Sequence, residues 1–194
     1  PGFIYPRSSL QRRPFYSKLG TPTILMSYCV YCSQLSTSHI DRIYHDTLYG
    51  RTCTDDNELF GRLILEINQA GLSWHTILKK SESIREGYAD FDIGKVANYK
   101  RKNIEKLLGN TGVIRHKGKI DAIIYNASQI LKLQDQYGSF YNWLKQKGEI
   151  TLEEWIKVFK KKFKFVGKEI VNEFLTSNGI IEGAHDKTCP LYTK

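Results

Sequence analysis

Glu66 is the residue whose position in this chain most needs a chemical explanation. On the helix expected from 55 to 70 it lies about 20° from Leu59, at the edge of the apolar stripe. A carboxylate there is costly unless it meets a partner or lines a pocket. Trp74 follows the break at Gly71, and an acid beside an aromatic ring can read and stack a nucleobase. The alternative is a boundary glutamate that pairs with an arginine or a lysine.

Two cysteines and two histidines near opposite ends of the chain could hold a metal ion. His185 and Cys189 are four residues apart, and Cys29 and His45 lie far upstream. Two sulfurs and two imidazoles are a common ligand set of structural zinc, which would tie down segments prone to fray. Spacing alone leaves the set open, because Cys32 forms a C-x-x-C pair with Cys29 and is a rival ligand. Scattered, independent cysteines and histidines are the alternative.

A glycine-rich turn with several cations indicates contact with a nucleic-acid backbone. A helix start exposes free N–H groups and a partial positive charge, which suits a phosphate. Glycine lets the backbone approach such a group closely. The candidate DNA-binding residues are Gly112, Arg115, His116, Lys117, Gly118 and Lys119. The simpler interpretation is a glycine-rich loop with solvated cations.

A second basic stretch, 157–168, interleaves lysines with Phe159, Phe163 and Phe165. Its simpler interpretation is an amphipathic helix with the aromatic rings inside and the lysines outside. Contact with a polyanion is the alternative.

The elements that must position these residues are predicted to be helices. Asp55 with Glu58 forms a capping-box signature, and Ser73 can cap the next helix. Further helices fit 94–98, 103–108, 117–133, 138–147, 151–162 and 167–178. Since no alternating strand pattern appears, we expect an all-α fold in one compact unit.

Composition narrows the class of protein. The 194 residues carry a formal net charge of +9, which favours a polyanionic partner such as nucleic acid. No run is long enough to span a membrane, and four cysteines are too few for a disulfide-stapled secreted domain. We therefore expect a soluble, cytoplasmic protein, active as a monomer. Residues 1–25 lack periodicity and are interpreted as a vector-derived or upstream-translated extension of a domain spanning 26–194.

Four motifs resemble the bacterial DNA-3-methyladenine glycosylase I family. They occur in family order across nearly all of 26–194: Tyr44-His45-Asp46, the run from Glu66 to Trp74 with Leu78-Lys79-Lys80, the run from Gly112 to Ile120, and Phe163 to Gly167. The resemblance implies an all-helical domain of the helix–hairpin–helix superfamily that removes 3-methyladenine from alkylated double-stranded DNA and releases the free base.

The resemblance also implies roles for particular residues. A structural zinc ion would join the two ends through Cys29, His45, His185 and Cys189, with Cys29 in place of Cys32. Glu66, the residue closest to a catalytic role, would contact the flipped base. Tyr44 would line the same pocket, and Trp74 would stack against the base. The pocket motif contains no lysine nucleophile, so we expect no strand-cleaving lyase step.

Departures from the family pattern put the substrate preference in question. Asp41 stands where a tyrosine is expected, and Ile67 replaces the glycine after the pocket glutamate. Leu48 and Tyr49 replace Glu-Trp in the segment after Tyr-His-Asp, and Ala184 replaces a polar residue. The alternative function is therefore a non-catalytic or altered-specificity helix–hairpin–helix DNA-binding paralogue.

Overall fold

Most α-helices of the described chain begin at a side chain that accepts a hydrogen bond from an exposed backbone N–H group. The carboxylate of Asp55 accepts from the N–H of Glu58 at 2.9 Å, and the hydroxyl of Ser73 accepts from Thr76 at 3.2 Å. Both helix starts are confirmed. The carboxylate of Glu58 pairs with Arg85 at 2.8 Å rather than completing the expected capping box.

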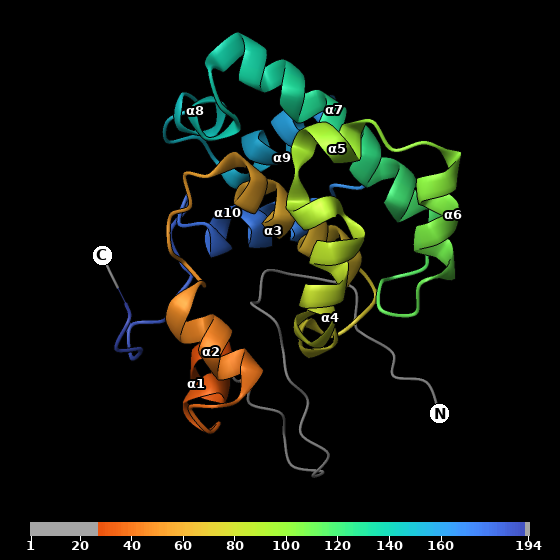
Figure 1. Cartoon of the computed structure of the whole chain (residues 1–194). Coiled ribbons are helices and arrows are strands. Elements are labelled where there is room, and N and C mark those ends of the chain that lie inside the picture. Colours follow the sequence, from red (N-terminus) through yellow and green to blue (C-terminus); the bar gives the residue numbers. More distant parts are fainter. Residues whose placement is uncertain (1–26, 193–194) are drawn as a thin grey trace.

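The computed structural model describes residues 27–192, and the proposed extension 1–25 lies outside these residues. Within them the chain is all-helical, without strands (Figure 1). The helices are α1 (Tyr28–Ser33), α2 (Ile40–Thr47), α3 (Asp56–Gln69), α4 (Trp74–Gly87), α5 (Ile93–Ala97), α6 (Arg101–Gly109), α7 (Lys117–Tyr137), α8 (Phe140–Lys145), α9 (Leu152–Lys162) and α10 (Lys168–Ser177), with a 3₁₀ turn, η1 (Ala89–Phe91), between α4 and α5. The all-α expectation is confirmed.

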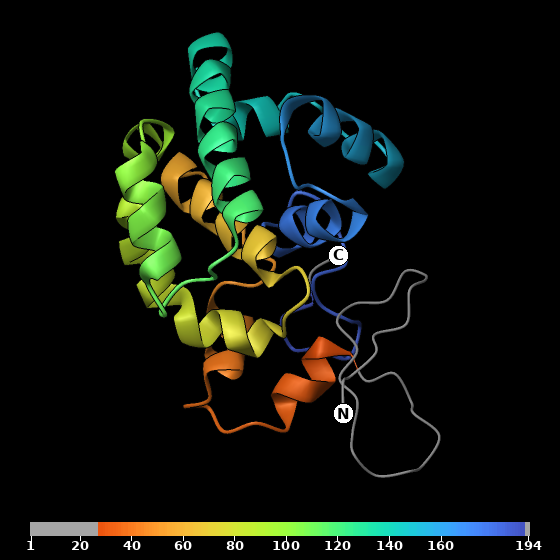
Figure 2. The same ribbon diagram turned by 90° about the vertical axis from the view of Figure 1, so that its right-hand side faces the viewer.

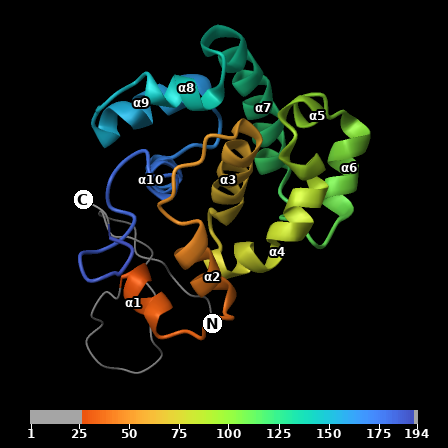
Figure 3. The same ribbon diagram turned by 60° about the vertical axis from the view of Figure 1, so that its left-hand side comes forward.

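The helix α3 lies at the centre of the fold, and it contacts α4, α5, α7, α8 and α10 (Figure 3). Its apolar face, which includes Leu59, Leu63 and Ile67, is completely buried. Gly61 is required on this helix, because a Cβ there would lie 2.1 Å from the ring of Phe91. Glu66 is therefore carried by a central helix that is packed on several sides.

An aromatic cluster forms the core between α8, α9 and α10. Its buried rings are Phe140, Trp143, Trp155, Phe159, Phe163 and Phe174. Most lysines of the stretch 157–168 are exposed to solvent. The simpler interpretation of that stretch is confirmed for Phe159 and Phe163, whereas Phe165 is 40% exposed.

The two ends of the described chain meet beside α2, where the C-terminal segment lies next to α1 (Figure 2). The N–H of Gly50 donates to the carbonyl of Ser177 at 2.9 Å. Gly50 has a φ of +74°, and a Cβ there would lie 2.5 Å from the Cβ of Ala184. Glycine is needed at this crossing both for its φ and for the close approach.

None of the helices formed by residues 27–192 is both long and apolar enough to cross a lipid bilayer.

Candidate active site and metal centre

Four side chains from three segments converge between the ends of the chain. Cys29 lies on α1, His45 on α2, and His185 and Cys189 in the C-terminal segment. Their ligand atoms all lie within 4.8 Å of one another. The Cys29 Sγ is 3.7 Å from His185 Nδ1, and the Cys189 Sγ is 3.7 Å from His45 Nε2 and 3.5 Å from His185 Nδ1. The four predicted ligands are thus assembled in one place.

These distances fit a tetrahedral metal ion. Zinc binds sulfur at about 2.3 Å and imidazole nitrogen at about 2.0–2.1 Å, so a tetrahedral site separates sulfur from nitrogen by about 3.6 Å. The three sulfur–nitrogen distances of 3.5–3.7 Å agree with that value. Cys32 is not part of the group, because its thiol donates to the carbonyl of Asp41 at 3.6 Å. The cluster therefore contains Cys29 and not Cys32, as the resemblance implied.

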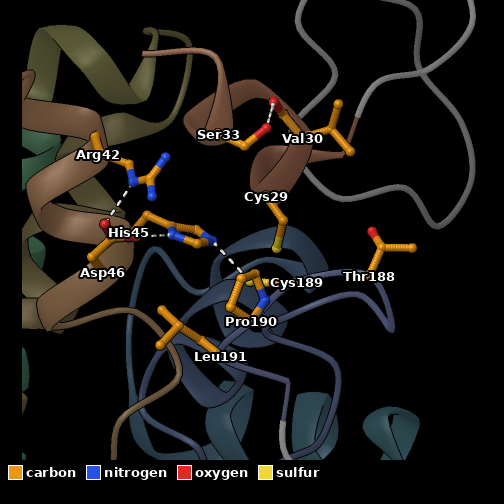
Figure 4. A pocket seen from close by; sticks show the side chains of 10 residues that line it. All are labelled: Cys29, Val30, Ser33, Arg42, His45, Asp46, Thr188, Cys189, Pro190 and Leu191. Carbon is orange, nitrogen blue, oxygen red and sulfur yellow. Dashed lines mark hydrogen bonds and ion pairs between the residues drawn. The ribbon is translucent and has the colours of Figure 1, made fainter. Parts of the chain in front are cut away.

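The second ring nitrogen of each histidine is held in place, and Figure 4 shows this for His45 with Asp46 and Arg42. His45 Nδ1 lies 2.7 Å from the carboxylate of Asp46, which in turn accepts from Arg42 Nε at 2.5 Å. His185 Nε2 lies 3.0 Å from the carbonyl of Tyr49. Such partners fix the orientation of the ring and direct the other nitrogen to a metal. His45 presents Nε2 and His185 presents Nδ1.

Burial shifts the pKa of two of these side chains, with opposite consequences for binding a cation. Burial raises the pKa of the Cys29 thiol to about 12, so that without a nearby cation the sulfur stays protonated. Burial lowers the pKa of His185, which keeps its imidazole neutral and able to bind a metal.

The predicted base-pocket residues lie near the junction of α2, α3 and α4. Tyr44 and Trp74 are both buried, with ring centroids 5.0 Å apart and an interplanar angle of 59°. Glu66 is 2% exposed and lies one turn before the end of α3. The chain leaves that helix, turns at Gly71 with a φ of +86°, and begins α4 at Trp74. The structure thus places all three residues in the interior, on helices that pack together.

A group that the sequence analysis missed lies one turn before Tyr44 on α2. The carboxylate of Asp41 is completely buried, and its Oδ2 lies 2.5 Å from His75 Nδ1 and 3.5 Å from His39 Nδ1. The two imidazole rings stack with centroids 5.3 Å apart. Asp41 Oδ1 is buried without a hydrogen-bond partner. Because Asp41 and His75 are 34 residues apart, no spacing rule could have found this pair.

The predicted DNA-binding turn joins α6 to α7. Arg115, His116 and Lys117 are exposed at the start of α7, where Lys117 pairs with Asp121 at 2.6 Å. A Cβ at Gly112 would lie 2.7 Å from the side chain of Ser83, so this glycine allows a close approach between the turn and α4. Gly118 lies in the first turn of α7, within the helix that the sequence predicted to begin at 117.

Lys119 differs from its neighbours, because its side chain turns inward and is only 5% exposed. Its ammonium group donates to the carbonyl of Asn68 at 2.9 Å and to that of Ala70 at 2.7 Å. Burial lowers the pKa of Lys119. A cation in a basic run is usually solvated, so nothing in the local pattern indicated this inward position.

The all-helical fold, the exposed cations at one helix start and the Cys/His cluster between the termini define the class: a DNA glycosylase fold of the 3-methyladenine DNA glycosylase I type. A crystal structure of 3-methyladenine DNA glycosylase I superimposes with a TM-score of 0.75 at 34% identity, over 84% of this chain and 99% of that chain. A 3-methyladenine DNA glycosylase I variant in complex with 3-methyladenine gives a TM-score of 0.75 at 32% identity, over 84% of this chain and 97% of that chain.

Sequence comparisons identify the family. Residues 34–158 match the model of the methyladenine glycosylase family, and the chain belongs to that family. It is 37% identical to DNA-3-methyladenine glycosylase 1 of Escherichia coli (strain K12) over 169 residues, which cover 77% of this chain and 90% of that protein. It is 33% identical to DNA-3-methyladenine glycosylase of Haemophilus influenzae, over 77% of this chain and 91% of that protein.

Proposed function

We propose that this protein is a DNA repair glycosylase that hydrolyses the N-glycosidic bond of 3-methyladenine in alkylated double-stranded DNA. The observation that carries the proposal is the buried Tyr44–Trp74 ring pair, beside the helix that bears the buried Glu66, in a member of the methyladenine glycosylase family. Relatives and structural neighbours named for this activity support it.

Hydrolysis of this glycosidic bond requires little from the protein beyond recognition of the methylated base. Methylation at N3 makes the base cationic in the nucleotide, so the glycosidic bond is already weak and the base leaves neutral. The protein must extrude the nucleotide, at a cost of a few kcal/mol that is smallest for a damaged base. Water then attacks a sugar with oxocarbenium character. Undamaged purines keep a strong glycosidic bond and are poor substrates.

The three interior residues have distinct roles in this proposal. Glu66 accepts hydrogen bonds from the exocyclic amine and the ring edge of the flipped base, and so recognises methyladenine. Trp74 stacks on the base, and Tyr44 lines the same pocket. Glu66 acts through recognition rather than as a general base.

The protein acts without a lyase step. A lyase nucleophile would be an unprotonated amine that is free to attack the sugar. Lys119, in the first turn of α7, is a buried lysine whose ammonium donates to two carbonyls at the end of the helix that bears Glu66. This arrangement favours hydrolysis that leaves an intact strand with an abasic site.

The Cys29, His45, His185 and Cys189 group holds a structural zinc ion in this proposal. Its donor set and its sulfur–nitrogen distances support tetrahedral zinc, and four protein ligands leave no open position for catalysis. Bound zinc would supply a cross-link between the two ends of the chain.

In this proposal the exposed side chains of Arg115, His116 and Lys117, at the start of α7, bind the phosphate backbone of the DNA.

A second candidate is a paralogue with an altered base preference. The observation that favours it is Asp41, a buried carboxylate with an unpartnered oxygen on the helix face of Tyr44. Both candidates bind duplex DNA, so binding does not separate them.

Chromatography of the bases freed from methylated duplex DNA tests the two candidates. The proposal predicts 3-methyladenine as the dominant free base. Release of other methylated purines in its place would establish altered specificity, and absence of any free base would establish a non-catalytic binding module.

A further inference from the structure

The buried ammonium group of Lys119, on α7, donates hydrogen bonds to the C-terminal end of α3. Its two acceptors, the carbonyls of Asn68 and Ala70, lie at the C-terminal end of α3 at 2.9 and 2.7 Å. Carbonyls at a helix C-terminus lack intrahelical partners and carry a partial negative charge, so a cation there satisfies them and stabilises the end of the helix.

These acceptors lie within the segment that connects two proposed base-binding residues. Asn68 follows Glu66 by two residues, and Ala70 is the first residue to leave helical geometry, with a ψ of 113°. After Gly71 the chain enters α4, which begins at Trp74. The segment between Glu66 and Trp74 thus receives two hydrogen bonds from one side chain of another helix.

The backbone of Lys119 belongs to the proposed DNA-binding turn. It lies in the first turn of α7, where its backbone N–H donates to the capping imidazole of His116 at 3.1 Å. Its neighbour Lys117 is exposed on the same turn. The ring of Phe165 lies over the ammonium group, 5.9 Å from Nζ, and also contacts the ring of His116.

We infer that Lys119 is a positioning residue that fixes the Glu66–Trp74 corner to the DNA-binding turn. A DNA strand bound at the start of α7 then lies at a fixed distance and orientation from the base pocket. The inference rests on the proposed function, and it assigns Lys119 to the pocket rather than to the phosphate contacts expected from the sequence.

The test compares four lysine variants of the zinc-loaded protein. Lys119→Met keeps the aliphatic chain but removes the donor, and Lys119→Arg keeps donors that can reach the carbonyls. Lys117→Met removes an exposed cation from the same turn. Lys132→Met, on the exposed side of α7, is the matched control. Each variant is assayed for duplex affinity with its salt dependence, for single-turnover base release at saturating DNA, and for binding of free 3-methyladenine.

Lys119→Met is expected to slow base release by about tenfold or more and to weaken free 3-methyladenine binding, because the pocket corner is no longer held. Its affinity for undamaged duplex and its salt slope stay at the wild-type values. Lys119→Arg recovers part of the lost rate. Lys117→Met shows the opposite pattern in binding, with lower duplex affinity and a smaller salt slope.

Two outcomes would overturn the inference: wild-type rate and base affinity in Lys119→Met, or a loss of salt slope in Lys119→Met equal to that of Lys117→Met. If Lys119→Met does not fold, Lys119→Arg is judged instead, and a wild-type rate with a reduced salt slope contradicts the inference. Absence of base release by the wild type would contradict the proposed function, whereas free-base binding would still test the role of Lys119.

Discussion

The side chains proposed to bind the base are deeply buried. Glu66 is 2% exposed and Trp74 4%, so each of them acts in an environment where an unmade contact is costly. Sequence reasoning located both from a helical wheel and a helix break, because those depend on local periodicity. It missed the buried pair of Asp41 with His75 and the inward turn of Lys119, since these depend on contacts between distant segments.

Glu66→Gln and Trp74→Ala should each slow 3-methyladenine release by roughly ten- to a hundredfold. Losing a buried hydrogen-bond partner or a stacking surface costs about 1–3 kcal/mol, at about 1.4 kcal/mol per tenfold in rate. Single-turnover kinetics measure the effect, with affinity for undamaged duplex as the control that should not move. Full activity of Glu66→Gln would assign Glu66 to a structural role.

Asp41→Asn should lower the free energy of unfolding by about 1.5–3 kcal/mol, because it removes a charge-assisted hydrogen bond of a buried group. Urea denaturation measures the change. Asp121→Asn is the control, since the ion pair of Asp121 with Lys117 is solvent-exposed and contributes little. Equal stability of the two variants would contradict the structural role of the Asp41–His75 pair.

Most helices of the described chain were predicted, including the short α5 and α8, and the first two were missed. The sequence predicted α3 and α4 from their caps and apolar faces, and the hydrophobic period predicted α7, although this helix continues to Tyr137 beyond the expected 133. It missed α1 and α2, which have 6 and 8 residues. Helices this short are marginally stable on their own. Tertiary contacts stabilise them, such as the packing of the Tyr28 ring against the Tyr49 ring, whose centroids are 5.4 Å apart.

The start of α7 should account for most of the salt dependence of DNA binding. Replacing Arg115 and Lys117 together with Gln should weaken binding to any duplex, damaged or not. The slope of log K against log salt should fall by about 0.9 for each phosphate that the protein no longer neutralises. Titrations at several salt concentrations check this prediction, and an unchanged slope would place the DNA on another surface.

At the scale of the whole molecule, the Cys/His cluster joins segments that are far apart in the sequence. Cys29 and Cys189 are separated by nearly the full length of the described chain, yet both contact His185. The ligand set could be proposed from residue types, but spacing alone could not choose between Cys29 and Cys32. Only the resemblance to the family made that choice before the fold was known.

Cys189→Ala should lose metal and stability together, because binding of the proposed zinc ion would contribute directly to the stability of the folded state. Atomic absorption and thermal melting measure the two effects. Cys53→Ala is the matched control, because Cys53 is a free cysteine outside the cluster. This variant should keep one zinc per chain. A full zinc content in Cys189→Ala would show that the ion is bound elsewhere.

The proposed activity, hydrolytic release of 3-methyladenine without strand cleavage, is tested most directly by counting the products formed from methylated duplex DNA. The zinc-loaded wild-type protein is incubated with this DNA, and free 3-methyladenine, abasic sites and strand breaks are quantified together. A glycosylase without lyase activity leaves one abasic site for each 3-methyladenine released, with the strand intact until alkali is added. Absence of free 3-methyladenine, or strand breaks formed in step with its release, would contradict this function.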